Sequence, residues 1–134
     1  MFTLKPLQCT WAGLALGLIA TTSPALAADT LTPQQISEQL VGKTLVGRDH
    51  ISASKPSRHV VLLFKPDGTL ELEVHKKNGN WTDSGRWHLS DTGYCVTWTK
   101  FHSGEERCNT VQRDGDVYRT VHSDGSPSME LRVQ

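Results

Sequence analysis

Residues 59–76 read HVVLLFKPDGTLELEVHK, an apolar run and a run of alternating apolar and polar side chains on either side of the turn sequence Pro-Asp-Gly. Alternation with a period of two is typical of a β-strand that buries one face. With Lys65 opposite Thr69, the cross-strand pairs are all apolar: Phe64 with Leu70, Leu62 with Leu72, and Val60 with Val74. A slip of one residue would turn all of them to the other face, so the sequence predicts this hairpin register.

Short runs of this kind recur along the chain, separated by the turn sequences PDG, NGN, DTG, HSG, DG and SDG. The predicted strands are 43–48, 59–65, 69–76, 85–90, 94–100, 105–113, 116–122 and 128–133. Such spacing predicts an all-β fold, either a small antiparallel barrel of about eight strands, lipocalin-like, or a sandwich.

One short N-terminal helix is expected before these strands. The sequence TPQQ at 32–35 is a capping box with proline at the first helical position. Ile36 and Leu40 then lie four residues apart on one face, and Gly42 can end the helix. We expect this helix to pack on one end of the sheet.

The later turns extend the predicted register across the remaining strands. The predicted pairs are Leu89–Tyr94, Trp87–Val96, Gly85–Trp98, Cys95–Cys108, Val96–Arg107, Tyr94–Asn109, Val111–Tyr118, Tyr118–Leu131 and Thr120–Met129. One face then becomes mostly apolar: Phe64, Leu72, Trp87, Val96, Tyr118 and Leu131. We expect this face to form the core of the domain.

The N-terminal segment predicts export. Lys5 precedes an apolar run at 11–20 that is too short to cross a bilayer, and Ala-Leu-Ala at 25–27 is a cleavage pattern. Residues 1–27 are therefore a predicted signal peptide, which leaves 28–134 as a single β-barrel-like domain. We expect a periplasmic or secreted protein with no membrane anchor after cleavage.

Cysteine usage agrees with that compartment. The chain has three cysteines, and cleavage would remove Cys9, leaving Cys95 and Cys108 as an even pair. In an exported domain such a pair predicts a disulfide, worth roughly 3 kcal/mol. The 14 basic and 14 acidic residues give a net charge of zero, so charge offers no argument for a nucleic-acid partner. No cofactor is expected.

The stretch GRWHLSDTGYCVTWTKFHSGEERCNTVQRDGDVYR at 85–119 contains G-x-W, Y-C-x-x-W, C-N-x-V and D-G-D-x-Y, after FKPDGT at 64–69. These motifs resemble a family of small secreted bacterial proteins of unknown function, over roughly residues 60–120. Some relatives carry a label of dihydrodipicolinate reductase, yet this chain has no glycine-rich nucleotide loop. The resemblance therefore implies a fold and no catalytic residues.

The first candidate site lies inside the predicted barrel. The register directs these side chains to the inner face: Arg107, Asn109, Thr120, His122, Trp87, Tyr94 and Trp98. An inward arginine and histidine beside tryptophans could hold an anionic or aromatic small ligand. The alternative is that they lie at an open barrel end, solvated or paired with Glu105.

The second and third candidates lie outside. His59 opposite His75, with His88 on a neighbouring strand, could bind a transition metal, unless they are scattered surface histidines. Trp81, expected on a loop, is either an interface anchor or a plug over the barrel mouth. No catalytic motif is present in the sequence. We therefore expect a small-ligand-binding or accessory module rather than an enzyme, the alternatives being an interaction domain, such as an inhibitor of an exported enzyme, or a surface metal-binding protein.

Overall fold

A computed structural model of the chain describes residues 28–50 and 55–134. The predicted signal peptide at 1–27 lies outside these residues. The elements are β1 (Asp29–Thr30), α1 (Pro33–Leu40), β2 (Thr44–Asp49), β3 (His59–Phe64), β4 (Thr69–Val74), β5 (Trp81–Leu89), β6 (Tyr94–Trp98), η1 (Phe101–Gly104), β7 (Glu106–Asp114), β8 (Val117–His122) and β9 (Pro127–Val133). The all-β prediction with one short helix is confirmed.

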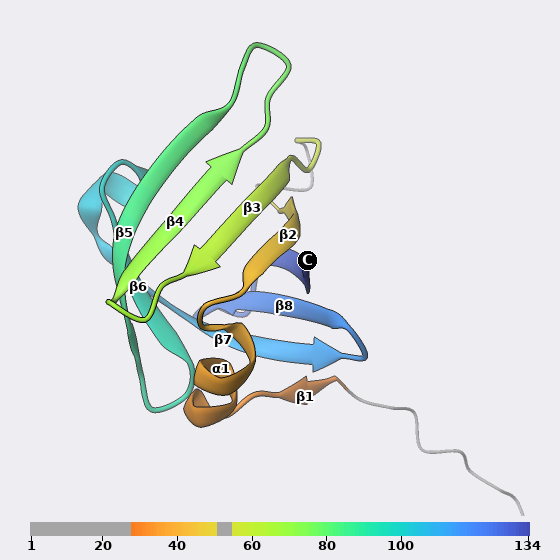
Figure 1. Cartoon of the computed structure of the whole chain (residues 1–134), viewed down its shortest axis with the longest axis vertical. Helices are drawn as coiled ribbons and strands as arrows, with labels where there is room; N and C mark the ends of the chain where they lie inside the picture. Colours follow the sequence, from red (N-terminus) through yellow and green to blue (C-terminus); the bar gives the residue numbers. More distant parts are fainter. Residues whose placement is uncertain (1–27, 51–54) are drawn as a thin grey trace, which may run out of the picture.

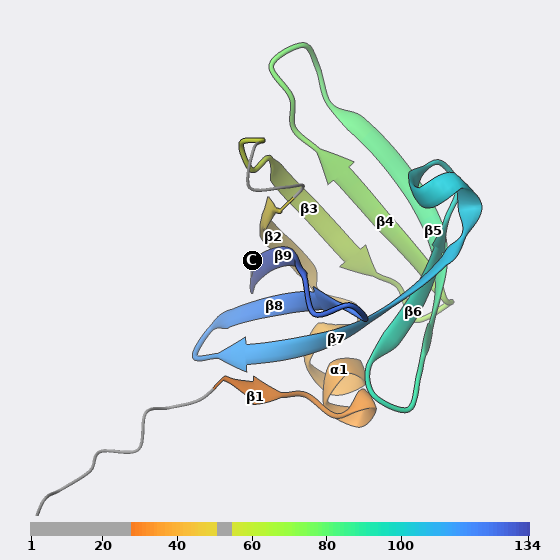
Figure 2. The ribbon, with the colours of Figure 1, turned by 180° about the vertical axis from the view of Figure 1, so that it is seen from behind.

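Eight of the strands close into an antiparallel barrel. Each strand from β2 to β8 pairs with its successor in the chain, and β9 pairs back with β2 to complete the ring. Strand β1 adds to the edge of β7 beyond the point where β6 ends, as Figure 2 shows. The barrel form is thus correct, and the sandwich alternative is not adopted.

Closure depends on a close backbone approach between β2 and β9. Gly47 lies opposite Leu131, and a Cβ atom at Gly47 would stand only 1.8 Å from the carbonyl oxygen of Glu130. Since that oxygen belongs to the backbone, it cannot move aside without opening the seam. Glycine is therefore required where the first and last barrel strands meet.

The predicted registers are confirmed for the β3–β4, β5–β6, β6–β7 and β8–β9 pairs. The β7–β8 turn was predicted wrongly. The loop residues are Gly115 and Asp116, so Val111 lies opposite Thr120 rather than Tyr118. The first loop position has a φ of 62°, which glycine adopts at little cost, and the expected turn would have put Asp114 there. Because the shift is two residues, the inward face is unchanged.

The start of β5 also differs from the prediction. The strand begins at Trp81 instead of residue 85, and Trp81 lies opposite Val74 at the end of β4. The four polar-rich residues at 81–84 complete the hydrogen-bonding edge that β4 would otherwise leave unpaired. Trp81 is therefore a strand residue and not a loop residue.

Helix α1 closes one end of the barrel (Figure 1). Its predicted capping box is present, and Ile36 and Leu40 are fully buried in the core. The chain after the helix is fixed by the Gly42 N–H, which donates to the carbonyl of Phe64 over 2.8 Å. Tyr118 Oη reaches the helix by a hydrogen bond to Gln39 over 3.1 Å. These contacts hold the helix and the chain after it against this end of the barrel.

The predicted disulfide joins Cys95 on β6 to Cys108 on β7. The two residues lie directly opposite each other in the sheet, with Cα atoms 3.9 Å apart. The bond therefore crosslinks two neighbouring strands whose pairing brings Tyr94 opposite Asn109 and Val96 opposite Arg107. It favours an oxidising compartment for the protein.

Candidate functional site

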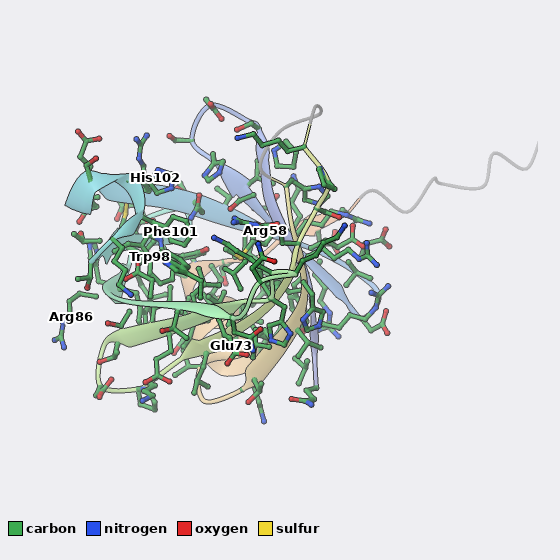
Figure 3. The ribbon with its side chains drawn as sticks, turned by 90° about the horizontal axis from the view of Figure 1, so that it is seen from above. Arg58, Glu73, Arg86, Trp98, Phe101 and His102 are labelled. Carbon is green, nitrogen blue, oxygen red and sulfur yellow. A yellow bond between two sulfur atoms is a disulfide. The ribbon has the colours of Figure 1, made fainter. Side chains whose placement is uncertain are left out.

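The end of the barrel opposite α1 contains a cavity of about 280 Å³. The apolar part of its wall comes from four different strands: Val60, Leu62, Leu72, Val96, Trp98 and Met129. Figure 3 looks toward this end, with Trp98, Phe101 and His102 on one side and Arg58 nearer the middle. A pocket with an apolar wall and a few polar groups is the usual form of a small-molecule site.

Most of the first predicted site is assembled here. The cavity is lined by Tyr94, Trp98, Arg107, Asn109 and His122, all of which the sequence directed to the inner face. Thr120 is buried and accepts a hydrogen bond from the Met129 N–H, but it does not line the cavity.

Trp87 is inward-facing but lies away from this cavity. Its Nε1 donates to the carbonyl of Lys65 over 3.0 Å, and its ring packs edge-to-face on Phe64 at 5.4 Å. Both partners belong to the turn region near α1, at the closed end. Alternation correctly predicted that Trp87 faces inward. Its position along the barrel axis, near the closed end, separates it from the cavity.

A polar chain runs from the barrel interior toward the opening. His122 Nδ1 lies 2.9 Å from Asn109 Oδ1, and Tyr94 hydrogen-bonds to both Asn109 and Thr120. Burial raises the pKa of Tyr94 to about 12, despite these two hydrogen bonds. Tyr94 therefore stays a neutral hydroxyl at any physiological pH, and His122 is held by Asn109 from within the wall.

An ion pair that the sequence reasoning missed lies at the rim. Asp49 accepts hydrogen bonds from the Arg58 backbone N–H at 2.8 Å, from its Nε at 3.0 Å and from its Nη2 at 2.6 Å. The Asp49 side chain is only 11% exposed. Arg48 pairs with His59, so Asp49 and Arg58 continue the β2–β3 register by one step. No register between β2 and β3 was predicted from the sequence, so nothing in the sequence pattern pointed to this pair.

Segment η1 forms another part of the rim. Phe101 and His102 line the cavity, and His102 and Ser103 have φ angles of 52° and 54°. Non-glycine residues in this left-handed region carry strain, which is found often at ligand-binding segments. The buried Asp83 carboxylate fixes the start of the segment, because it accepts the N–H groups of Lys100 and Phe101.

The electrostatic environment of His102 is positive. Desolvation, Arg107 and His122 together lower the pKa of His102, and Glu105 opposes them. The rings of His102 and His122 stand 6.5 Å apart in an edge-to-face arrangement. Burial is the largest cause of this lowering, and an anion placed here would offset the smaller part that comes from Arg107 and His122.

The three predicted metal-ligating histidines do not meet. His59 and His75 have ring centroids 4.7 Å apart, and His75 Nε2 contacts Glu73 Oε1 at 2.7 Å. His88 lies beyond Arg86, which pairs with Thr69 at the opposite end of β4 from His75. The expected three-histidine group is therefore corrected to a pair and a distant single residue.

His88 has a different set of neighbours. Among the residues that the structure describes, the one group of three potential metal ligands is His88, Cys95 and Glu106. Cys95 is already oxidised in the disulfide, so its sulfur is not a thiolate ligand. His88 instead contacts Glu106 at 3.2 Å, and hydrogen bonds to Leu89 and Glu106 raise its pKa.

Trp81 is half-buried in its strand rather than displayed on a loop. Its ring packs edge-to-face on Phe101 at 4.4 Å, and Lys76 Nζ and Lys100 Nζ lie 5.5 and 5.3 Å from the ring centroid. Phe101 in turn lines the cavity. Trp81 thus packs against a rim residue without lining the cavity itself, and its role as an interface anchor or as a plug stays a prediction.

The comparisons with known proteins add no family. No family model, curated protein or solved structure matches the chain. The resemblance stated from the motifs at 85–119 therefore stays a prediction. Within residues 28–50 and 55–134, no helix has the length and apolarity needed to span a bilayer.

Proposed function

We propose that this protein is an exported small-ligand-binding module, with the cavity at the open barrel end as its binding site. The observation that supports the proposal is the lining of this cavity, which combines an apolar wall with two arginine and three histidine side chains. An eight-stranded barrel is wide enough to hold one small ligand where side chains do not fill its interior. Asp49 lines the cavity, but its carboxylate is already engaged in an ion pair with Arg58. This pairing agrees with a binding role.

The experiment compares two variants of one strand. Val60 lines the cavity, and Val61 points to the outer face of β3. In Val60→Phe the larger ring would fill part of the cavity, whereas Val61→Phe would leave it open. Added volume in a core costs about 1–3 kcal/mol, so a thermal melt of both variants checks that they remain folded.

Native mass spectrometry then measures any compound that stays bound to the protein purified from periplasm. The full chain is expressed for export and kept under non-reducing conditions. We expect an adduct that disappears on denaturation, is retained in Val61→Phe and is lost in Val60→Phe. An adduct retained equally in both variants would contradict binding in the cavity.

A further inference from the structure

We propose that the ligand of the open-end cavity is a small organic carboxylate, bound with its charge at the rim and its apolar or aromatic body inside the barrel. This inference rests on the proposed function and names the chemical class that the site selects.

The charges of the rim favour an anion. Among the cavity-lining residues that the structure describes, Asp49 is the only carboxylate, and Arg58 already neutralises it. The lining adds a second arginine and three histidines: Arg107, His50, His102 and His122. Arg107 brings a positive charge to the opening and the three histidine rings bring N–H donors, a set of groups that can attract an anion and orient it.

Arg107 is the group best placed to receive the charge. Its partner in the free protein is Glu105, at 3.4 Å, and the two side chains are 48% and 71% exposed. An ion pair so exposed contributes little stability. A ligand carboxylate can therefore take the place of Glu105, and the planar guanidinium offers it two parallel N–H donors.

The apolar part of the cavity wall disfavours a polar ligand body. Every buried side-chain nitrogen and oxygen in the described part of the chain already has a hydrogen-bond partner. The deep wall itself is made of Val60, Leu62, Leu72 and Val96. A sugar or other polyhydroxylated compound would leave its inner hydroxyls without partners, which costs about 1–3 kcal/mol for each group. An apolar body avoids this cost.

The size of the cavity limits the body to a short one. A volume of about 280 Å³ holds roughly nine water molecules at about 30 Å³ each. That space suits a compound of about ten non-hydrogen atoms, such as phenylacetate, and is too small for a long-chain fatty acid. Trp98 and Phe101 on the wall offer aromatic surfaces to such a ring.

The test uses two ligands of matched size and shape that differ in charge and in one hydrogen-bonding group, a carboxylate oxygen in one and an amide NH2 in the other. Phenylacetate and phenylacetamide have the same shape and number of non-hydrogen atoms, and isothermal titration calorimetry at pH 7 gives the Kd of each. We expect phenylacetate to bind at least tenfold more tightly. Replacing Arg107 by glutamine should weaken phenylacetate roughly tenfold and leave phenylacetamide unchanged.

The matched control is Arg86→Gln. Arg86 is an exposed arginine on β5 that points away from the barrel in Figure 3, so this variant removes the same charge far from the opening. It should leave both Kd values unchanged, and a weakening equal to that of Arg107→Gln would overturn the assignment to the rim.

Two other outcomes separate this inference from the proposed function. Equal Kd values for acid and amide, insensitive to Arg107→Gln, would overturn the carboxylate class while leaving a ligand in the cavity. Failure of both phenylacetate and hexanoate to bind at millimolar concentration would also overturn the class. The mass measurement on Val60→Phe and Val61→Phe then decides the proposed function by itself.

Discussion

Replacing Asp49 by asparagine should lower the stability of the fold and raise its affinity for an anion. Asp49 accepts three hydrogen bonds from Arg58, two of them from the guanidinium. Asparagine keeps a single acceptor oxygen, so at least one of these bonds is lost and Arg58 keeps an unbalanced charge. The two changes have opposite signs for folding and for binding, which makes the variant a sensitive test.

The expected loss of stability follows from the burial of the pair. Breaking a buried ion pair costs about 3–5 kcal/mol. The Arg58 and Asp49 side chains are 24% and 11% exposed, so solvent recovers part of the loss, and we expect about 2 kcal/mol. For a domain of this size that lowers Tm by roughly 10 °C. The measurement is a thermal melt followed by circular dichroism.

The expected gain in affinity follows from the freed charge of Arg58. A freed unit charge on the lining of the same cavity attracts a carboxylate, and salt screens part of that attraction. Phenylacetate should therefore bind about fivefold more tightly to Asp49→Asn than to the wild type. The double variant Asp49→Asn/Arg58→Gln should lose this gain. A fall in affinity in the single variant, or a Tm within about 2 °C of the wild type, would refute the reasoning.

Three further changes test other parts of the account. Gly47→Ala would set a Cβ against the Glu130 carbonyl, and it should destabilise the barrel by about 2–4 kcal/mol in urea unfolding. A loss of stability smaller than that of Val46→Ala would contradict the requirement for glycine where β2 meets β9. Because burial raises the pKa of Tyr94 to about 12 from about 10 when unfolded, its stabilising effect should be complete below pH 10 and decline above it. Between pH 9 and pH 11 the wild type should lose about 1.3 kcal/mol relative to Tyr94→Phe; parallel pH profiles would exclude this cause. The pKa of His102 is lowered by desolvation, Arg107 and His122, so the unfolded chain binds the proton more readily and Tm should fall as pH drops below about 6.5. His102→Gln should reduce that fall, and an unchanged acid profile would argue against it.

The barrel register was predictable because several short-range signals agree. In the β3–β4 hairpin the turn sequence and the apolar pairs from Phe64–Leu70 to Val60–Val74 select the same alignment. Where only one signal existed, the prediction failed. The Asp114-Gly115-Asp116 sequence fits two turns, and only the backbone requirement for a positive φ at Gly115 distinguishes them.

For the candidate site, the sequence predicted which side of the sheet each residue faces but not its position along the barrel axis. Alternation correctly directed Arg107, Asn109 and His122 inward, where they line one cavity. It also grouped Trp87 with them, although Trp87 packs on Phe64 near the closed end. A period of two fixes which side of a sheet a residue faces, and says nothing about its position along the barrel axis. For the same reason, alternation did not show that His88 and His75 lie toward opposite ends of β4.

Two parts of the rim had no sequence pattern of their own. Asp49 and Arg58 come together because β2 and β3 are paired. His102 reaches the cavity because η1 adopts left-handed backbone angles at two non-glycine residues, which residue preferences disfavour. Both features depend on tertiary structure, so single-residue tendencies could not reveal them.

The most direct test of the binding site is methyl nuclear magnetic resonance of the full chain purified after export, titrated with phenylacetate. The inward methyl groups of Val60, Leu62, Leu72 and Val96 line the cavity, while Val61 and Leu63 on β3 point outward. The account predicts saturable shifts for the four inward residues and none for Val61 and Leu63. Shifts confined to the outward methyl groups, or no shifts at all, would contradict it.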